Sequence, residues 1–223
     1  MSKLDRSKVS LEDALEELPL FPLPQVVLFP RMSLPLHIFE QRYRKMVADC
    51  LDGHGAMAVV LLARPPANDA NGQPRIARVA GAGIVLEHQP LPDGRSNILL
   101  VGQARVALEE LPFAPPYRRA RARVLRDVDT PVSGADLAAL LGAATAFAHE
   151  VRRRDASFTF ELAPNLSPGA AADACAHHLV IDIEARQRAL ETLDVAERVH
   201  LVTAELAAQH GALAGAPKKE SLN

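Results

Sequence analysis

Short hydrophobic runs separated by turn residues fill the first half of the chain, and this pattern predicts β-strands. The segment from Leu18 to Phe39 mixes β-branched and aromatic residues with five prolines. Proline cannot donate a hydrogen bond to a β-ladder, so strands here must be short and must lie at edges or corners. Ala56 to Ala63 is a continuous apolar run, as expected of a strand buried on both faces. Residues 64–74, which follow it, have loop composition and predict a flexible excursion.

Two longer strand-like runs follow at residues 75–89 and 97–111, and the Asp93-Gly94 pair between them predicts the turn of a β-hairpin. In residues 117–127, basic and apolar residues alternate, so a final strand is expected with one basic and one apolar face. The basic positions are Arg119, Arg121 and Arg123, and the apolar positions are Ala120, Ala122 and Val124.

One amphipathic helix interrupts the predicted strands. It covers residues 40–53, with the acidic Glu40 at its start and Gly53 as a stop. Its apolar side chains recur at helical spacing and should share one face. They are Tyr43, Met46, Val47 and Cys50.

From about residue 130, the apolar residues recur with the 3.6-residue period of α-helices. Capping residues indicate the helix starts. They are Ser133 with Asp136, Ser167 with Pro168, Asp182, and Asp194 with Glu197. Strands first and helices second predict an α+β fold and argue against a doubly wound parallel sheet.

This change of pattern also divides the chain into segments. We expect an amino-terminal tail at residues 1–17 and a β-barrel subdomain with one helix at 18–128. A helical subdomain should follow at residues 129–210, and the alanine- and lysine-containing end, 211–223, should be a flexible tail.

The composition is that of an ordinary globular protein that needs no cofactor to fold. Of 223 residues, 48% are hydrophobic and 23% are charged, which fits neither a disordered nor a membrane protein. No apolar stretch is long enough to span a bilayer, and the acidic first residues do not resemble a signal peptide, so a cytoplasmic location is expected. The net charge of −2 lacks the basic bias of a dedicated nucleic-acid-binding protein.

The cysteines and histidines offer one alternative chemistry. Cys50 and Cys175 are the only cysteines, and a reducing compartment would keep both as thiols. With His54 and His178 they could in principle form a zinc site, because such spacings are permissible on helices. The set matches no zinc module, so we favour small core residues for the cysteines and surface positions for the histidines. We therefore expect no metal.

Three blocks of the chain carry more specific motifs. The proline-rich opening contributes Leu18, Pro19, Pro22, Leu23, Val26, Val27, Pro30, Met32, Pro35 and Leu36. The predicted hairpin contributes Gly81, Gly83, Asp93, Gly94, Gly102 and Arg105. The closing helices contribute Gln187, Leu190, Glu191, Asp194 and Arg198. In this order, over about residues 18–209, the blocks resemble the amino-terminal substrate-recognition domain of the Lon protease family.

The resemblance implies a PUA-like β-barrel followed by an α-helical bundle, in agreement with the order of strands and helices. It implies recognition of unfolded or degron-bearing polypeptides, and it leaves open a separate protease as a further partner. Full Lon needs a Gly-x-x-x-x-Gly-Lys-Ser/Thr loop and a Ser-Lys catalytic pair. The loop is missing, and Lys45 lies on a predicted amphipathic helix, where a solvated lysine is expected. We therefore expect a non-catalytic protein with an adaptor role in protein quality control.

Parts of the chain depart from the family pattern. They are the proline- and alanine-rich insert near residues 64–75 and the stretch from about 110 to 165. Contacts that relatives make through these segments are not carried over. A site hidden between residues 110 and 165 would leave an unrecognised enzyme as a third hypothesis.

Binding of unfolded polypeptides requires an exposed apolar patch or an open strand edge. Phe29, Met32, Tyr43 and Met46 are the candidates for such a patch. The helical spacing among them favours a role in the core, so both interpretations are kept.

The alternative function is RNA binding, because relatives with a PUA-like barrel bind RNA. Arg119, Arg121 and Arg123 would contact the phosphates, although a solvated strand face is the favoured interpretation of this stripe. Aromatic residues make up only 4% of the chain and tryptophan is absent, so surfaces for stacking single-stranded bases are scarce.

Overall fold

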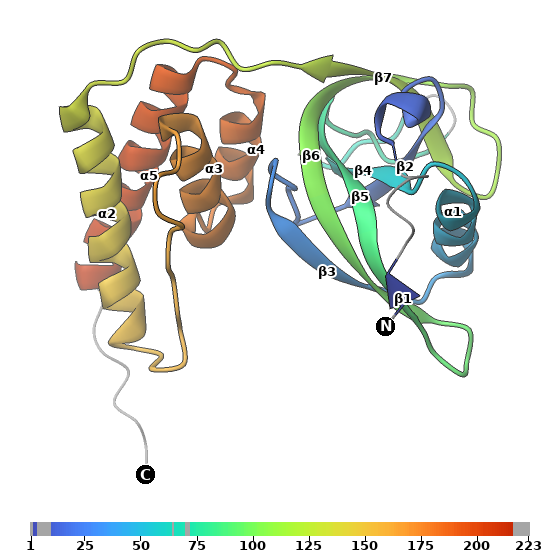
Figure 1. Ribbon diagram of the computed structural model, residues 1–223, viewed down its shortest axis with the longest axis horizontal. Helices are drawn as coiled ribbons and strands as arrows, with labels where there is room; N and C mark the ends of the chain where they lie inside the picture. The colour runs from blue at the N-terminus through green and yellow to red at the C-terminus, as the bar shows by residue number, and fades with distance from the viewer. Residues whose placement is uncertain (1, 4–9, 64, 70–71, 216–223) are drawn as a thin grey trace. The chain divides into compact units, whose positions relative to one another are not determined.

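The computed structural model describes residues 2–3, 10–63, 65–69 and 72–215. The chain divides into two compact units, residues 1–126 and 127–223 (Figure 1). The first unit holds the strands and the second holds helices alone in its described part. The predicted α+β fold is therefore confirmed.

The first unit is a β-barrel with one α-helix. Its elements in chain order are β1 (Ser2–Lys3), η2 (Glu12–Ala14), β2 (Leu18–Leu23), β3 (Ser33–Ile38), α1 (Gln41–Asp52), β4 (Ala56–Leu61), β5 (Val79–Pro90), β6 (Ser96–Glu110) and β7 (Arg118–Leu125). Strands β2, β4, β5, β6 and β7 pair around a closed ring in which only the β2–β4 pair is parallel. Outside the ring, β1 adds to β5 and β3 adds to β6. The predicted barrel is confirmed.

Hydrophobic periodicity explains most of these elements. β4 is buried at every position, as the continuous apolar run predicts. α1 buries the four predicted side chains in one core cluster, together with Leu28 and Leu100. In β7, Ala120 and Ala122 face the core as predicted, whereas Val124 is 36% exposed and does not.

The β5–β6 hairpin is also confirmed. Its turn lies at the predicted Asp93-Gly94 pair, where the Asp93 carboxylate accepts a hydrogen bond from the Arg95 N–H at 3.0 Å. Residues 27–29 run close beside this hairpin and are almost fully buried. The backbone of Leu28 approaches Gly81 so closely that a Cβ there would lie 1.8 Å from the Leu28 carbonyl oxygen.

The segment before β2 is more structured than the predicted amino-terminal tail. η2 covers Glu12–Ala14, and Ala14 is buried in the core. The Leu15 carbonyl accepts a hydrogen bond from the Ala122 N–H at 2.7 Å, which fixes this segment to β7. Residues 4–9 of the predicted tail lie outside the described part of the chain.

The second unit is a bundle of α2 (Gly134–Arg152), α3 (Pro168–Leu179), α4 (Ile183–Glu191) and α5 (Val195–Gly215). Every predicted helix start is confirmed, because the capping oxygens of Ser133, Ser167, Asp182 and Asp194 each accept a backbone N–H of the first turn. The predicted flexible tail begins as helix, since α5 continues to Gly215, and residues 216–223 lie outside the described part. None of the described helices is long and apolar enough to cross a membrane.

Packing in the bundle depends on small residues in α3. This helix buries nearly its whole length with alanines, glycine and Cys175, so neighbouring helices can approach it closely. α2 contributes Leu140, Ala144 and Phe147 to the buried face, as its periodicity predicts. Leu141, the residue after Leu140, is 38% exposed.

Arg198 is the largest fully buried side chain of the described residues and has no exposed surface. Its guanidinium donates to both carboxylate oxygens of Asp127, at 3.0 and 2.6 Å, and to the Thr192 carbonyl at 2.7 Å. Its Nε lies 3.1 Å from the buried carboxylate of Asp173. A buried cation needs such partners because leaving water is otherwise very unfavourable. The network therefore joins the first residue of the unit to α3 and α5.

We predict that Gly81→Ala destabilises the first unit. The new Cβ would meet a backbone oxygen that cannot move without shifting residues 27–29, and overpacking of this kind costs about 1–3 kcal/mol or more. Urea denaturation measures the loss. Gly142→Ala in α2 is the control, because nothing lies within 4 Å of its Cβ and alanine favours a helix by up to about 1 kcal/mol. Equal midpoints for the two variants would contradict the prediction.

We also predict that Arg198→Met lowers the free energy of unfolding by about 3–5 kcal/mol, because it leaves the buried Asp173 carboxylate without its cation. The measurement is chemical denaturation followed by circular dichroism. Arg188→Met on α4 is a matched control, since Arg188 is exposed and its loss should change stability by no more than about 0.5 kcal/mol. A stable Arg198→Met protein would show that the network is dispensable.

Candidate functional site

Strand β3 forms an open edge of the sheet in the described residues, because it pairs with β6 on one side only. At its start, the Met32 carbonyl accepts a hydrogen bond from the Gly102 N–H at 2.9 Å. In an antiparallel pair the backbone groups of alternate residues point to the same side. The backbone groups of Met32 point toward β6, so the backbone groups of Ser33, Pro35 and His37 point away from it. These three residues are also exposed.

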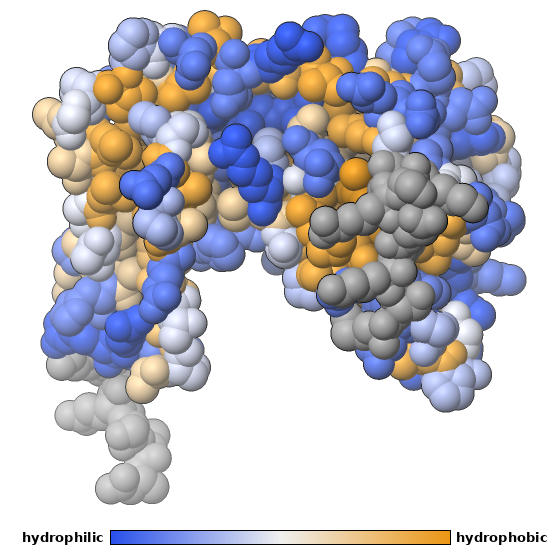
Figure 2. All heavy atoms as spheres, in the orientation of Figure 1, coloured by the Kyte–Doolittle hydropathy of each residue, from blue (hydrophilic) through white to orange (hydrophobic). Residues whose placement is uncertain are grey.

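The side chains of β3 alternate between solvent and core. Leu34 and Leu36 are half-buried and pack against the core cluster that contains Met46 and Leu100, and Ile38 is fully buried. Because no further strand covers Leu34 and Leu36 in the described residues, part of each leucine remains in contact with water. In the view of Figure 2, apolar surface appears over the strands of the first unit, between polar regions.

An exposed aromatic residue follows β3 directly. Phe39 is 61% exposed, and its ring stacks on the ring of His37 with centroids 6.1 Å apart. The His37 imidazole lies 2.7 Å from the Asn97 side-chain oxygen, and the Asn97 amide donates to Gln89 at 3.4 Å. Phe39 is thus a large exposed apolar residue directly beyond the open edge, and we take it as a candidate for contact with a ligand.

The four residues predicted for a polypeptide-binding patch do not form one. Phe29 and Met46 have no exposed surface, and Tyr43 is 6% exposed. The Tyr43 ring packs on Phe21 with centroids 4.4 Å apart, and burial raises its pKa. The core interpretation therefore describes these three residues. Met32 is half-buried at the start of β3, so it alone of the four lies beside the open edge.

The arginine stripe on β7 is partly neutralised by nearby acids. Arg119 forms an ion pair with Glu17 at 2.7 Å, and Arg121 forms one with Glu16 at 2.9 Å. Both glutamates belong to the segment before β2. Arg123 is exposed and has no ion-pair partner among the described residues. The stripe is thus a weaker phosphate-binding surface than the three arginines alone suggest.

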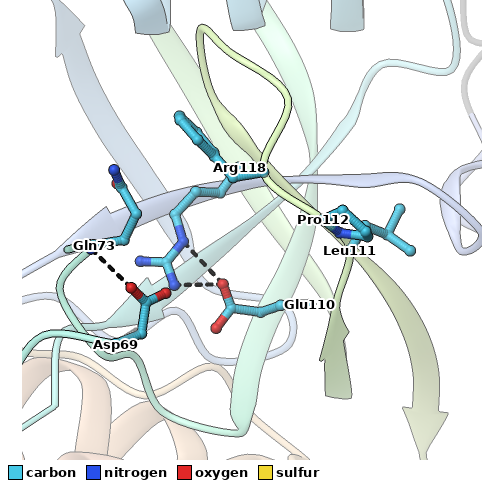
Figure 3. Close-up of a pocket in the computed structure, with 7 residues that line it drawn as sticks. Asp69, Gln73, Glu110, Leu111, Pro112 and Arg118 are labelled. Carbon is cyan, nitrogen blue, oxygen red and sulfur yellow. Dashed lines mark hydrogen bonds and ion pairs between the residues drawn. The ribbon is translucent and has the colours of Figure 1, made fainter. Parts of the chain in front are cut away.

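A pocket of about 260 Å³ lies beside Arg118 in the first unit, and Figure 3 shows its polar side chains. It is lined by Asp69, Gln73, Glu110, Leu111, Pro112, Phe113 and Arg118. The buried Arg118 guanidinium donates to Glu110 at 2.9 Å and to the Pro74 carbonyl at 2.5 Å. The bond to the Pro74 carbonyl attaches the end of the loop between β4 and β5 to the barrel, so we assign Arg118 a structural role.

Sequence reasoning missed Arg118, although a signal was present. Arg118 is in phase with Ala120 and Ala122, and the alternation along β7 places all three on the inward face. The open edge had a signal too, because Pro35 marks a strand that does not pair on both sides. Phe39 was missed because nothing local distinguishes an exposed phenylalanine from a buried one.

Both cysteines behave as core residues. Burial raises the pKa of Cys50 and of Cys175 to about 12, so both are neutral thiols at neutral pH. The Cys50 thiol donates to the Ala56 carbonyl at 3.3 Å. Burial also lowers the pKa of His54 and of His178. Within the described part of the chain, no group of three or more His, Cys, Asp or Glu residues is placed to hold a metal ion.

Comparison with curated proteins finds Lon proteases. The Lon protease of Roseiflexus castenholzii is 31% identical over 194 residues, which are 85% of this chain and 24% of that protein. The Lon protease of Dictyoglomus thermophilum is 26% identical over 204 residues, 89% of this chain and 25% of that protein. The chain thus spans about a quarter of the length of these relatives.

Solved structures with a similar fold include the Lon N-terminal domain protein from Xanthomonas campestris, with a TM-score of 0.61 and 21% identity over 84% of this chain and 97% of that one. The N-terminal domain of the Mycobacterium avium complex Lon protease gives a TM-score of 0.60 and 14% identity, over 86% of this chain and 98% of that one. The family model of the ATP-dependent protease La (LON) substrate-binding domain matches residues 17–208. The chain therefore belongs to the family of Lon substrate-binding domains, as its motifs predict.

Proposed function

We propose that this chain binds unfolded or degron-bearing polypeptides without cleaving them, as a recognition module or adaptor in protein quality control. The observation that carries the proposal is the match of residues 17–208 to a substrate-binding domain. The 223 residues contain no Gly-x-x-x-x-Gly-Lys-Ser/Thr loop, so this chain supplies no phosphate-binding loop for ATP-driven unfolding. A separate protease would then degrade what the chain holds.

The open edge of β3 supports this function physically. An unfolded polypeptide exposes apolar side chains and unpaired backbone groups, and β3 presents surface of both kinds. Leu34, Leu36 and Phe39 supply apolar area that water would leave on binding. The outward backbone groups beside them remain available for hydrogen bonds.

The charge arrangement favours a polypeptide over RNA as the ligand. Arg119 and Arg121 already form ion pairs with glutamates, so RNA phosphates would have to displace those carboxylates. Burial of apolar surface, in contrast, depends little on ionic strength, whereas phosphate binding falls steeply with salt. A salt series therefore separates the two ligands.

We predict that the purified chain binds a permanently unfolded protein, such as reduced and alkylated lactalbumin, and that Phe39→Ala weakens this binding about tenfold. The expected loss corresponds to burying one phenylalanine side chain on the partner. Fluorescence anisotropy of the labelled polypeptide measures the affinity. Phe113→Ala is the matched control, because Phe113 is 42% exposed and follows the end of β6 that does not pair with β3.

The same titrations with mixed RNA complete the test. Polypeptide binding that persists from low to high salt supports the proposal. The proposal fails if the unfolded protein does not bind while RNA binds in a salt-steep manner that is lost when Arg119, Arg121 and Arg123 are all replaced by alanine. Cleavage of the polypeptide by the purified chain in the presence of ATP would contradict the non-catalytic part.

A further inference from the structure

We infer that the bound polypeptide is an extended segment that adds to the open edge of β3 as a new β-strand. This inference rests on the proposed function, because it specifies how the polypeptide is held. It assigns recognition mainly to backbone hydrogen bonds and only partly to side chains.

The outward backbone groups of β3 can form hydrogen bonds with another extended chain. Ser33 and His37 each direct an N–H and a carbonyl outward, and Pro35 between them directs a carbonyl. Alternate residues of a strand are about 6.6–6.8 Å apart, which is the spacing at which another extended chain presents its own groups. A polypeptide strand is thus complementary to this edge along its length. The missing N–H of Pro35 removes one hydrogen bond from the set.

Exposed sheet edges are normally protected by charged side chains, especially lysine, or by proline. The sequence of β3 is SLPLHI, which contains no Lys, Arg, Asp or Glu. Pro35 is its only protective residue. Pro35 therefore interferes with long, regular pairing of this edge with a second copy of the chain. The edge remains available to a short added strand.

The opposite side of the same sheet already holds an added strand. β1, which is only Ser2–Lys3, pairs antiparallel with Glu87 and His88 of β5. β5 and β6 pair with each other and β3 lies beyond β6, so β1 and β3 are the two outer strands of this layer. A very short extended segment thus forms a ladder on one edge, and the equivalent position on the other edge has no strand among the described residues.

Side chains next to the edge specify the kind of segment. An added strand would lie about 4.8 Å from β3, and its inward side chains would cover the exposed parts of Leu34 and Leu36. Apolar residues are therefore favoured at every second position of the bound segment. The outward positions would lie beside Ser33, Pro35 and His37 and accept polar residues. Phe39 would offer one further apolar contact near the end of the strand.

The test uses a labelled seven-residue peptide of alternating valine and threonine and two N-methylated forms of it. One form carries N-methyl groups on the amides of one strand edge, and the other carries them on the amides of the opposite edge. Only the peptide edge that faces β3 donates hydrogen bonds to it. The form methylated on that edge should therefore bind at least tenfold more weakly than the unmodified peptide, and the other form should bind much as the unmodified peptide does.

Two variants at one position test the protein side. His37→Pro removes an outward N–H without removing a β6 ladder bond, and should weaken peptide binding by about two- to tenfold. His37→Ala removes the imidazole but keeps the N–H, so it should weaken binding less. If His37→Pro fails to fold, by thermal melting, the methylated peptides still decide the question.

Equal effects of the two methylation patterns would overturn the inference, because binding would then depend on side chains alone. Unfolded lactalbumin would still bind in that case, so the proposed function would stand. If unfolded lactalbumin also failed to bind, both the inference and the proposed function would be wrong. A dimer of this chain that persists at saturating peptide but is lost in His37→Pro, measured by sedimentation, would also overturn the inference, because a second copy would then occupy the edge.

Discussion

The close passage of residues 27–29 along the β5–β6 hairpin is the constraint on which the first unit depends. β2 lies in the closed ring, whereas β3, the next strand along the chain, lies outside it on β6. The connecting segment must therefore cross the hairpin. It does so at two positions without side chains, since a Cβ on Gly81 would lie 1.8 Å from the Leu28 oxygen and one on Gly102 would lie 2.1 Å from the Phe29 oxygen. The crossing buries Leu28 and Phe29 and delivers the chain to the outer side of β6, which is why β3 becomes an edge.

Local patterns predicted the elements well because those elements depend on local chemistry. Capping residues such as Ser133 and Asp182 satisfy free N–H groups within three residues of themselves, so the sequence alone locates the helix starts. The continuous apolar run of β4 and the Asp93-Gly94 turn are equally local. The pairing of strands is not local, because it depends on contacts between residues that are distant in the sequence. The prolines of the opening indicated an edge strand, but not which of its sides would remain open.

The candidate site was harder to predict for a related reason. Phe29, Tyr43 and Met46 carry side chains that suit both a core and a binding patch, and only the position of residues 27–29 and of α1 decides between the two. Arg198 illustrates the opposite case. It matches a family motif and is charged, which makes a contact with a partner plausible from sequence, yet it is fully buried between Asp127 and Asp173. Its place in the motif is therefore explained by the stability of the bundle.

Recognition through a strand edge suits a ligand that has no fixed sequence. Every polypeptide carries the same backbone donors and acceptors, so hydrogen bonds to Ser33, Pro35 and His37 would select for an extended chain rather than for particular residues. A folded protein would not qualify, because its own secondary structure already uses those groups. The half-exposed Leu34 and Leu36 add a preference for alternating apolar residues, a pattern that folding normally hides in the interior of a sheet. The two features together would distinguish an unfolded strand from both a folded protein and a polar disordered chain.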